Sequence, residues 1–155
     1  MTDRKSSLTL CPLFMDSFRK PFVEIMWGII GTDIVGDGDP MDICVLTEKD
    51  LSHGDLLVDA IPIGGFRMID GNQADDKIIA VLKNDTVYGH VQCLEDVPKI
   101  VIQRLEHYFL TYKDMPGEER KTEISHVYGK EEALVVIQKA IQDYNERFDN
   151  IGLIL

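Results

Sequence analysis

Gly36-Asp37-Gly38-Asp39-Pro40-Met41-Asp42-Ile43 is the stretch around which the rest of the chain is organised. It places three carboxylates within six residues, where they repel one another unless a cation neutralises them. Glycine permits a tight turn and proline fixes φ, so the three side chains can converge on one point. Oxygen ligands of this kind suit hard divalent cations such as Mg²⁺. The stretch predicts a metal site; the plainer alternative is a solvated acidic turn.

The residues that follow this turn predict a set of short strands. Ile43-Cys44-Val45-Leu46 is short, apolar and partly β-branched, so we expect a buried strand that holds the acidic turn at its start. Glycine, asparagine and aspartate separate the later apolar runs, and Gly64-Gly65 is one of these breaks. Closely spaced short strands predict a small antiparallel barrel. The later runs are residues 56–63, 66–69, 77–82 and 86–91.

The apolar period becomes helical after Pro98. It predicts one helix that ends before Met115 and a second that starts after Gly129. Strands followed by helices indicate a single α+β domain over residues 1–155. The residues expected on the apolar faces are Ile100, Leu105, Tyr108, Phe109 and Tyr112 in the first helix, and Leu134, Ile137, Ile141, Tyr144 and Phe148 in the second.

Composition narrows the function classes. A net charge of -11 argues against nucleic acid or an anionic membrane as a partner. The three cysteines, Cys11, Cys44 and Cys93, follow no metal-binding spacing, so we expect reduced thiols in a cytoplasmic protein, with Cys44 in the core. No apolar run approaches a membrane-spanning length and no leader is visible, so we expect neither membrane insertion nor secretion.

A second acidic cluster, residues 68–77, also lies on a predicted turn and leads into an apolar strand. Two acidic turns can share one group of metal ions. Lys77 and the Tyr112-Lys113 pair add donors suited to an anionic oxygen. Each of these residues taken alone could be solvated or part of the core, but together they predict phosphate chemistry.

Asp37-Gly38-Asp39-Pro40-Met41-Asp42 resembles the signature of the soluble, Mg²⁺-dependent inorganic pyrophosphatases with an OB-type barrel. Residues 62–70, 75–81, 106–109 and 112–114 agree with that family, and the resemblance covers roughly Asp33 to the end. It implies a small antiparallel OB-like barrel followed by two C-terminal helices. It further implies a homo-oligomer that hydrolyses pyrophosphate to two phosphates.

The resemblance also implies roles for single residues. Asp39 becomes the general base that takes a proton from a metal-activated water. Such a site needs no Ser, Cys or His nucleophile, because phosphoryl transfer depends on positioning and charge stabilisation. The implied metal ligands are Asp37, Asp42, Asp70 and Asp75, and the implied phosphate-binding residues are Arg4, Lys77, Tyr112 and Lys113.

Residues 1–32 depart from the family pattern. The family's first strands, with a lysine and glutamates that reach the site, and a following Tyr-Gly pair are not recognisable there. A shifted reading frame over residues 15–30 would restore a family-like segment, so we expect a truncated chain with an altered frame. Two hypotheses remain, an active pyrophosphatase and a catalytically impaired metal-binding remnant. A calcium-binding module and an OB-type nucleic-acid binder are weaker alternatives.

Overall fold

The computed structural model describes residues 8–10, 22–27, 41–49, 58–117 and 122–148. The predicted site residues Arg4, Asp37 and Asp39 lie outside this part of the chain. The described elements are β1 (Leu8–Leu10), β2 (Phe22–Trp27), β3 (Met41–Leu46), β4 (Val58–Asp70), β5 (Gln73–Ala74), β6 (Lys77–Leu82), the short 3₁₀ helix η1 (Leu94–Asp96), α1 (Lys99–Thr111), β7 (Thr122–Gly129) and α2 (Lys130–Phe148).

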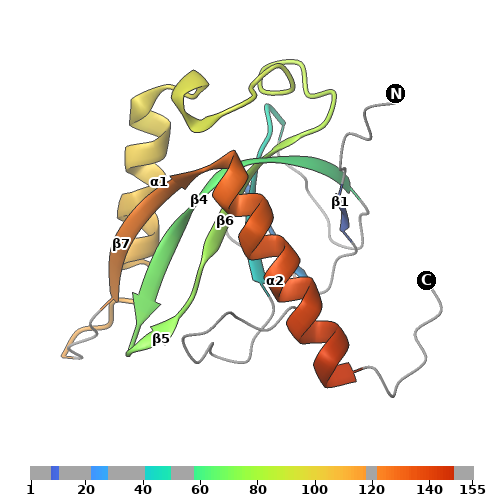
Figure 1. Ribbon diagram of the computed structural model, residues 1–155. Helices are drawn as coiled ribbons and strands as arrows, with labels where there is room; N and C mark the ends of the chain where they lie inside the picture. Colours follow the sequence, from blue (N-terminus) through green and yellow to red (C-terminus); the bar gives the residue numbers. More distant parts are fainter. Residues whose placement is uncertain (1–7, 11–21, 28–40, 50–57, 118–121, 149–155) are drawn as a thin grey trace.

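The strands form one sheet in the order β1-β4-β6-β3-β2, and β5 and β7 also pair with β4. Figure 1 shows β4 running beside β6 and β7, with α2 in front of the sheet and α1 at its left. The predicted α+β class and the two helices are confirmed, although β7 lies between α1 and α2 in the chain.

The sheet differs from the predicted antiparallel barrel in two ways. β3 and β6 run parallel, with Asp42 opposite Lys77, because the long strand β4 and its hairpin partner β5 provide the crossover between them. Among the described strands no pair joins β1 to β2, so this part of the chain forms an open mixed sheet.

β2 lies within residues 15–30, for which we expect a shifted reading frame. Its backbone pairs antiparallel with β3 from Phe22 opposite Leu46 to Trp27 opposite Met41. The other residues of that segment are outside the described chain, and the shifted frame stays a prediction.

Buried side chains lie on both faces of the sheet. On β3, Cys44 and Leu46 belong to a cluster that includes Leu105 and Phe109 of α1. The alternate residues Ile43 and Val45 belong to a cluster with α2. Because successive strand side chains point to opposite faces, α1 and α2 cover opposite faces of the sheet. The predicted buried strand at 43–46, with Cys44 in the core, is confirmed.

The two helices start where the sequence predicts, but their buried faces differ from the prediction. Leu105 and Phe109 are buried, whereas Ile100 is 61% exposed, because five helical residues rotate it about 140° away from Leu105. On α2, Ile141 is 40% exposed. Ile137 is buried as predicted. Val136 and the small residues Ala133 and Ala140 are buried with it, and the alanines let the helix approach the sheet closely.

The predicted runs 56–63 and 66–69 correspond, within the described residues 58–70, to one continuous strand, β4, and Gly64-Gly65 does not break it. A Cβ on Gly64 would lie 2.5 Å from Leu94 Cδ1, and a Cβ on Gly65 would lie 2.5 Å from the Tyr128 ring. The two glycines therefore make room for neighbours on opposite faces. The expected strand at 86–91 is also wrong, because those residues form turns.

We predict that Gly64→Ala lowers the free energy of unfolding by about 2 kcal/mol, because the new methyl group would overlap Leu94 and the Tyr128 carbonyl oxygen. Gly129→Ala is the matched control, since a Cβ there would meet only Glu131 Oε2 at 3.8 Å. Urea unfolding of both variants measures the difference. Equal stability of the two variants would contradict this packing role.

The Asp85 carboxylate connects the turn after β6 to the end of β3 by hydrogen bonds. Its Oδ1 accepts hydrogen bonds from the backbone N–H groups of Val87 at 2.9 Å and Tyr88 at 2.8 Å. Its Oδ2 accepts one from Glu48 N–H at 2.9 Å and one from the Thr47 hydroxyl at 3.1 Å. Burial raises the pKa of Asp85, but these hydrogen bonds outweigh burial and lower it below its ordinary value.

We predict that Asp85→Asn lowers the free energy of unfolding by about 1 kcal/mol at neutral pH, since an amide cannot accept all of these hydrogen bonds. The folded pKa is the lower one, so the contribution of the carboxylate is present above the unfolded pKa of about 3.9 and is lost as the pH falls through the folded value. Urea unfolding of both proteins at decreasing pH measures this. A difference that stays constant with pH would count against the prediction.

Candidate active site

The α1 face of the sheet gathers most of the predicted site residues. Asp42 and Lys77 are register partners on β3 and β6, and Lys77 shares its face with Ile79 of the α1 cluster. On β4, Asp70 has the same alternation as Phe66 and Met68, which also belong to that cluster. The site therefore lies where these strands pass beneath the end of α1.

Lys77 is the centre of this site. Its side chain is 1% exposed, and its ammonium group donates to the carboxylates of Asp42 and Asp75. The Lys77 Nζ atom also lies 5.9 Å from the centre of the Phe109 ring. Burial alone would lower the pKa of Lys77, but the two carboxylates raise it above its ordinary value. Lys77 is therefore a charged ammonium group that is paired with two carboxylates.

Lys113 bridges two carboxylates, as Lys77 does. Its Nζ atom donates to Asp70 Oδ2 at 2.7 Å and lies 3.8 Å from Asp75 Oδ2. The Thr122 hydroxyl donates to the other oxygen of Asp70 at 3.2 Å. Burial would lower the pKa of Lys113, but the hydrogen bond to Asp70 and the neighbouring charges raise it. Lys113 thus stays charged at neutral pH.

Tyr112 follows α1 directly, and its N–H donates to the Tyr108 carbonyl at the end of the helix. Its ring stacks on Tyr108 with a centroid distance of 5.1 Å, and Lys113 Nζ lies 5.4 Å from the Tyr112 ring centre. Partial burial raises the pKa of the Tyr112 hydroxyl, although Lys77 and Lys113 oppose that effect. The hydroxyl therefore remains a hydrogen-bond donor at neutral pH.

These contacts join five side chains into one row of alternating charge: Asp42, Lys77, Asp75, Lys113 and Asp70. In the described chain no group of three or more His, Cys, Asp or Glu side chains is arranged as a metal site, and ammonium groups lie between the carboxylates. The chemistry of the donors still fits a hard cation. Carboxylate oxygens are the ligands that Mg²⁺ prefers, and the ammonium groups show that this row attracts positive charge.

Sequence reasoning missed Thr122 as a partner of Asp70. The pairing of β4 with β7 shifts register between Arg67 and Met68, and this irregularity brings Thr122 opposite Asp70. A register shift of this kind has no signature in the residues of β7. Only the tertiary structure identifies Thr122.

Comparisons with known proteins agree with this geometry. A family model described as inorganic pyrophosphatase matches residues 7–145, so the match begins upstream of Asp33, where the resemblance in the sequence starts. An inorganic pyrophosphatase of Chlamydia caviae is 52% identical over 121 residues, which are 75% of this chain and 56% of that protein. One from Halalkalibacterium halodurans is 34% identical over 127 residues, covering 82% of this chain and 76% of that protein.

Solved structures give the same result. The crystal structure of an inorganic pyrophosphatase from Neisseria gonorrhoeae has a TM-score of 0.66 and 30% identity, and the match covers 76% of this chain and 65% of that chain. The chain therefore belongs to the inorganic pyrophosphatase family. The matched part of the chain spans 56% to 58% of the length of its chlamydial relatives.

None of the helices in the described part of the chain is long and apolar enough to cross a membrane.

We predict that Lys77→Met lowers the free energy of unfolding by about 3–5 kcal/mol, because it leaves Asp42 and Asp75 close together without their cation. Urea unfolding measures the loss. Asp75→Asn in the same chain should reduce the cost of the Lys77 substitution, because one of the two unpaired charges is then absent.

Lys83→Met is the control for this experiment. Lys83 lies 3.2 Å from Asp59, but both side chains are exposed, at 40% and 47%. Its loss should cost no more than about 1 kcal/mol. If both lysine substitutions cost the same, the buried row of charges does not stabilise the fold as described.

Proposed function

We propose that this chain hydrolyses inorganic pyrophosphate to two phosphates in the presence of Mg²⁺. The observation that carries this proposal is the row of alternating charge at the end of α1, because one site offers carboxylates for cations and ammonium groups for phosphate oxygens. Membership of the inorganic pyrophosphatase family supports the same reaction.

The carboxylates would hold Mg²⁺, which when bound neutralises substrate charge and lowers the pKa of a water molecule. Asp39 would act as the general base that accepts the proton of the attacking water. Asp39 precedes β3 in the sequence and is close in sequence to Asp42. The proposed metal ligands are Asp37, Asp42, Asp70 and Asp75.

The phosphate-binding side chains are Arg4, Lys77, Tyr112 and Lys113. An ammonium group has three N–H donors, so Lys77 can keep both carboxylates and still donate to a phosphate oxygen. Lys113 is 33% exposed, and the neutral Tyr112 hydroxyl lies beside it. Both can reach a substrate from solvent. Phosphoryl transfer needs this positioning and charge stabilisation more than it needs a covalent nucleophile.

The proposal includes a cytoplasmic location and a homo-oligomeric state. In the described chain Cys93 is a free thiol, which suits a reducing compartment. Ile100, Leu110 and Met115 are exposed apolar side chains at α1 and the turn after it, and a second copy could cover them. Nucleic acid is not expected as a partner, because the net charge is -11.

The impaired metal-binding remnant stays as the second candidate. Lys77 already forms salt bridges with Asp42 and Asp75. Its ammonium group therefore competes with a metal ion for the same carboxylate oxygens. Phosphate release from pyrophosphate with Mg²⁺, compared with release after chelation, separates the two candidates. Mg²⁺ binding without phosphate release would favour the remnant.

We predict that Asp39→Asn leaves the Mg²⁺ dissociation constant nearly unchanged and lowers the hydrolysis rate by about a hundred-fold or more, because the base is lost and the ligands remain. Asp42→Asn should instead weaken Mg²⁺ binding, measured by isothermal titration calorimetry. An equal loss of Mg²⁺ affinity in both variants would show that Asp39 is a ligand like Asp42.

A further inference from the structure

A second charged cluster lies on the opposite face of the sheet from the candidate active site. Arg67 of β4 has its Nε atom 3.5 Å from Asp76 Oδ1 and its Nη2 atom 3.2 Å from Glu132 Oε1. Its guanidinium carbon lies 5.5 Å from the centre of the Tyr128 ring. His126 Nε2 is 3.1 Å from the other oxygen of Glu132. Arg67 thus links β4, the start of β6, β7 and α2.

Strand alternation explains why this cluster faces away from the site. Phe66 is the register partner of Lys77, and both face α1. The neighbouring residues Arg67 and Asp76 point to the α2 face, where Tyr128 is buried against that helix. Asp76 lies between Asp75 and Lys77 in the chain. Asp75 and Lys77 therefore have their partners on the α1 face, whereas Asp76 between them has its partner Arg67 on the α2 face.

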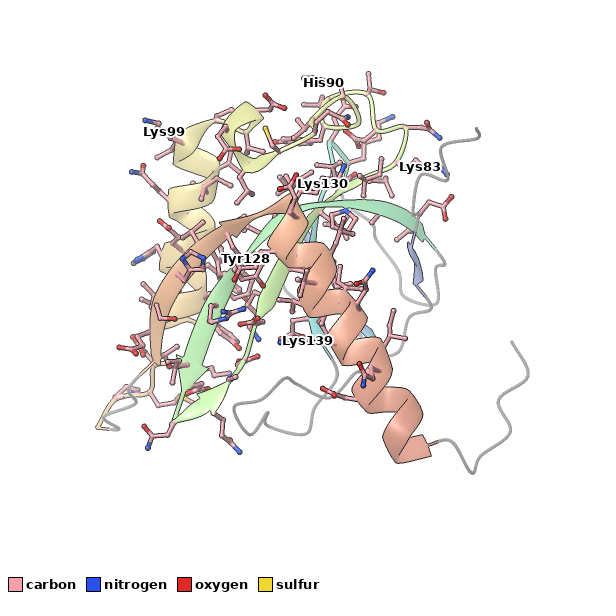
Figure 2. The ribbon with its side chains drawn as sticks, in the orientation of Figure 1. Lys83, His90, Lys99, Tyr128, Lys130 and Lys139 are labelled. Carbon is pink, nitrogen blue, oxygen red and sulfur yellow. The ribbon has the colours of Figure 1, made fainter. Side chains whose placement is uncertain are left out.

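The Asp76 side chain depends on Arg67. It is 10% exposed, and the buried Tyr128 side chain lies against it. The Arg67 guanidinium donates to Asp76 Oδ2 at 3.5 Å and is the cation that compensates the burial of this carboxylate. Figure 2 shows Tyr128 beside α2, and Lys83 well away from it at the upper right.

We propose that Arg67 is a positioning residue for the active site. By holding Asp76 against Tyr128 and α2, it fixes the start of β6 so that Asp75 and Lys77 face Asp42 and Lys113. The guanidinium acts through the backbone of β6 and touches neither metal nor substrate. This inference deepens the proposed function and rests on it, because Asp75 and Lys77 are proposed there as a metal ligand and a phosphate-binding residue.

The test compares Arg67→Met with Asp59→Asn, which breaks the exposed pair of Asp59 with Lys83 between the same two strands. Acylation of Lys77 by acetic anhydride is followed by mass spectrometry without metal or substrate. We expect Arg67→Met to raise the acylation rate of Lys77 by about ten-fold and to weaken Mg²⁺ binding by about ten-fold, as loss of a group that orients a ligand typically does. Asp59→Asn should change neither quantity.

Two further measurements distinguish a local displacement of Asp75 and Lys77 from a general opening of the sheet. Alkylation of Cys44, which is 3% exposed on the neighbouring strand β3, should stay as slow as in the unchanged protein. Asp76→Asn, which keeps the shape of the side chain, should act in the same direction as Arg67→Met. Combining Arg67→Met with Asp76→Asn should add little to either change, because both remove the same pair.

An unchanged acylation rate of Lys77 in both Arg67→Met and Asp76→Asn would overturn the inference. So would a parallel rise in Cys44 alkylation, because the sheet would then be opening as a whole. Failure of the proposed function would appear elsewhere, as the absence of phosphate release by the unchanged protein. The acylation measurement needs no metal and no substrate, so it decides the role of Arg67 in either outcome.

Discussion

The buried ammonium group of Lys77 is the interaction on which the rest of the site depends. A charge that is 1% exposed is costly unless opposite charges lie against it, and Asp42 and Asp75 supply them. Asp42 comes from β3 and Lys77 from β6, so this ion pair also fixes the parallel register of the two strands. A slip of one residue would turn Lys77 into the apolar cluster on the α2 face, where the described structure offers Ile43, Ala133 and Ile137 as neighbours.

The two faces of the sheet have different tasks. The α1 face carries the row of alternating charge above a cluster that contains Phe66, Leu105 and Phe109. The α2 face is held by small helix residues and by the Arg67 cluster. Neighbouring residues of one strand point to opposite faces, and this alternation separates the charged row from the Arg67 cluster. The start of β6 shows this most clearly, because Asp76 points away from the site that its two neighbours form.

Irregularities in β4 set the geometry of both faces. Register shifts occur between Pro62 and Gly64 and again between Arg67 and Met68. The first lets Ile63 and Phe66 lie in the same cluster although they are three positions apart, an offset that would place them on opposite faces of a regular strand. The second aligns Asp70 with Thr122. A single long strand with two register shifts can therefore pair with both β6 and β7.

The sequence alone determined the local features. Residues 43–46 predict a buried strand, and the start signals predict helices after Pro98 and Gly129. The two acidic clusters with Lys77, Tyr112 and Lys113 predict one shared site, in which the family resemblance implies the roles of Asp42, Asp70 and Asp75. Hydrophobic period, helix-start signals and the acidic motif are short-range patterns, so they are legible in one chain. The tertiary structure decided the parallel pairing of β3 with β6, the continuity of β4 through Gly64-Gly65, the contact of Thr122 with Asp70 and the pairing of Arg67 with Asp76. These depend on which strands become neighbours and in which register, and no short pattern carries that information.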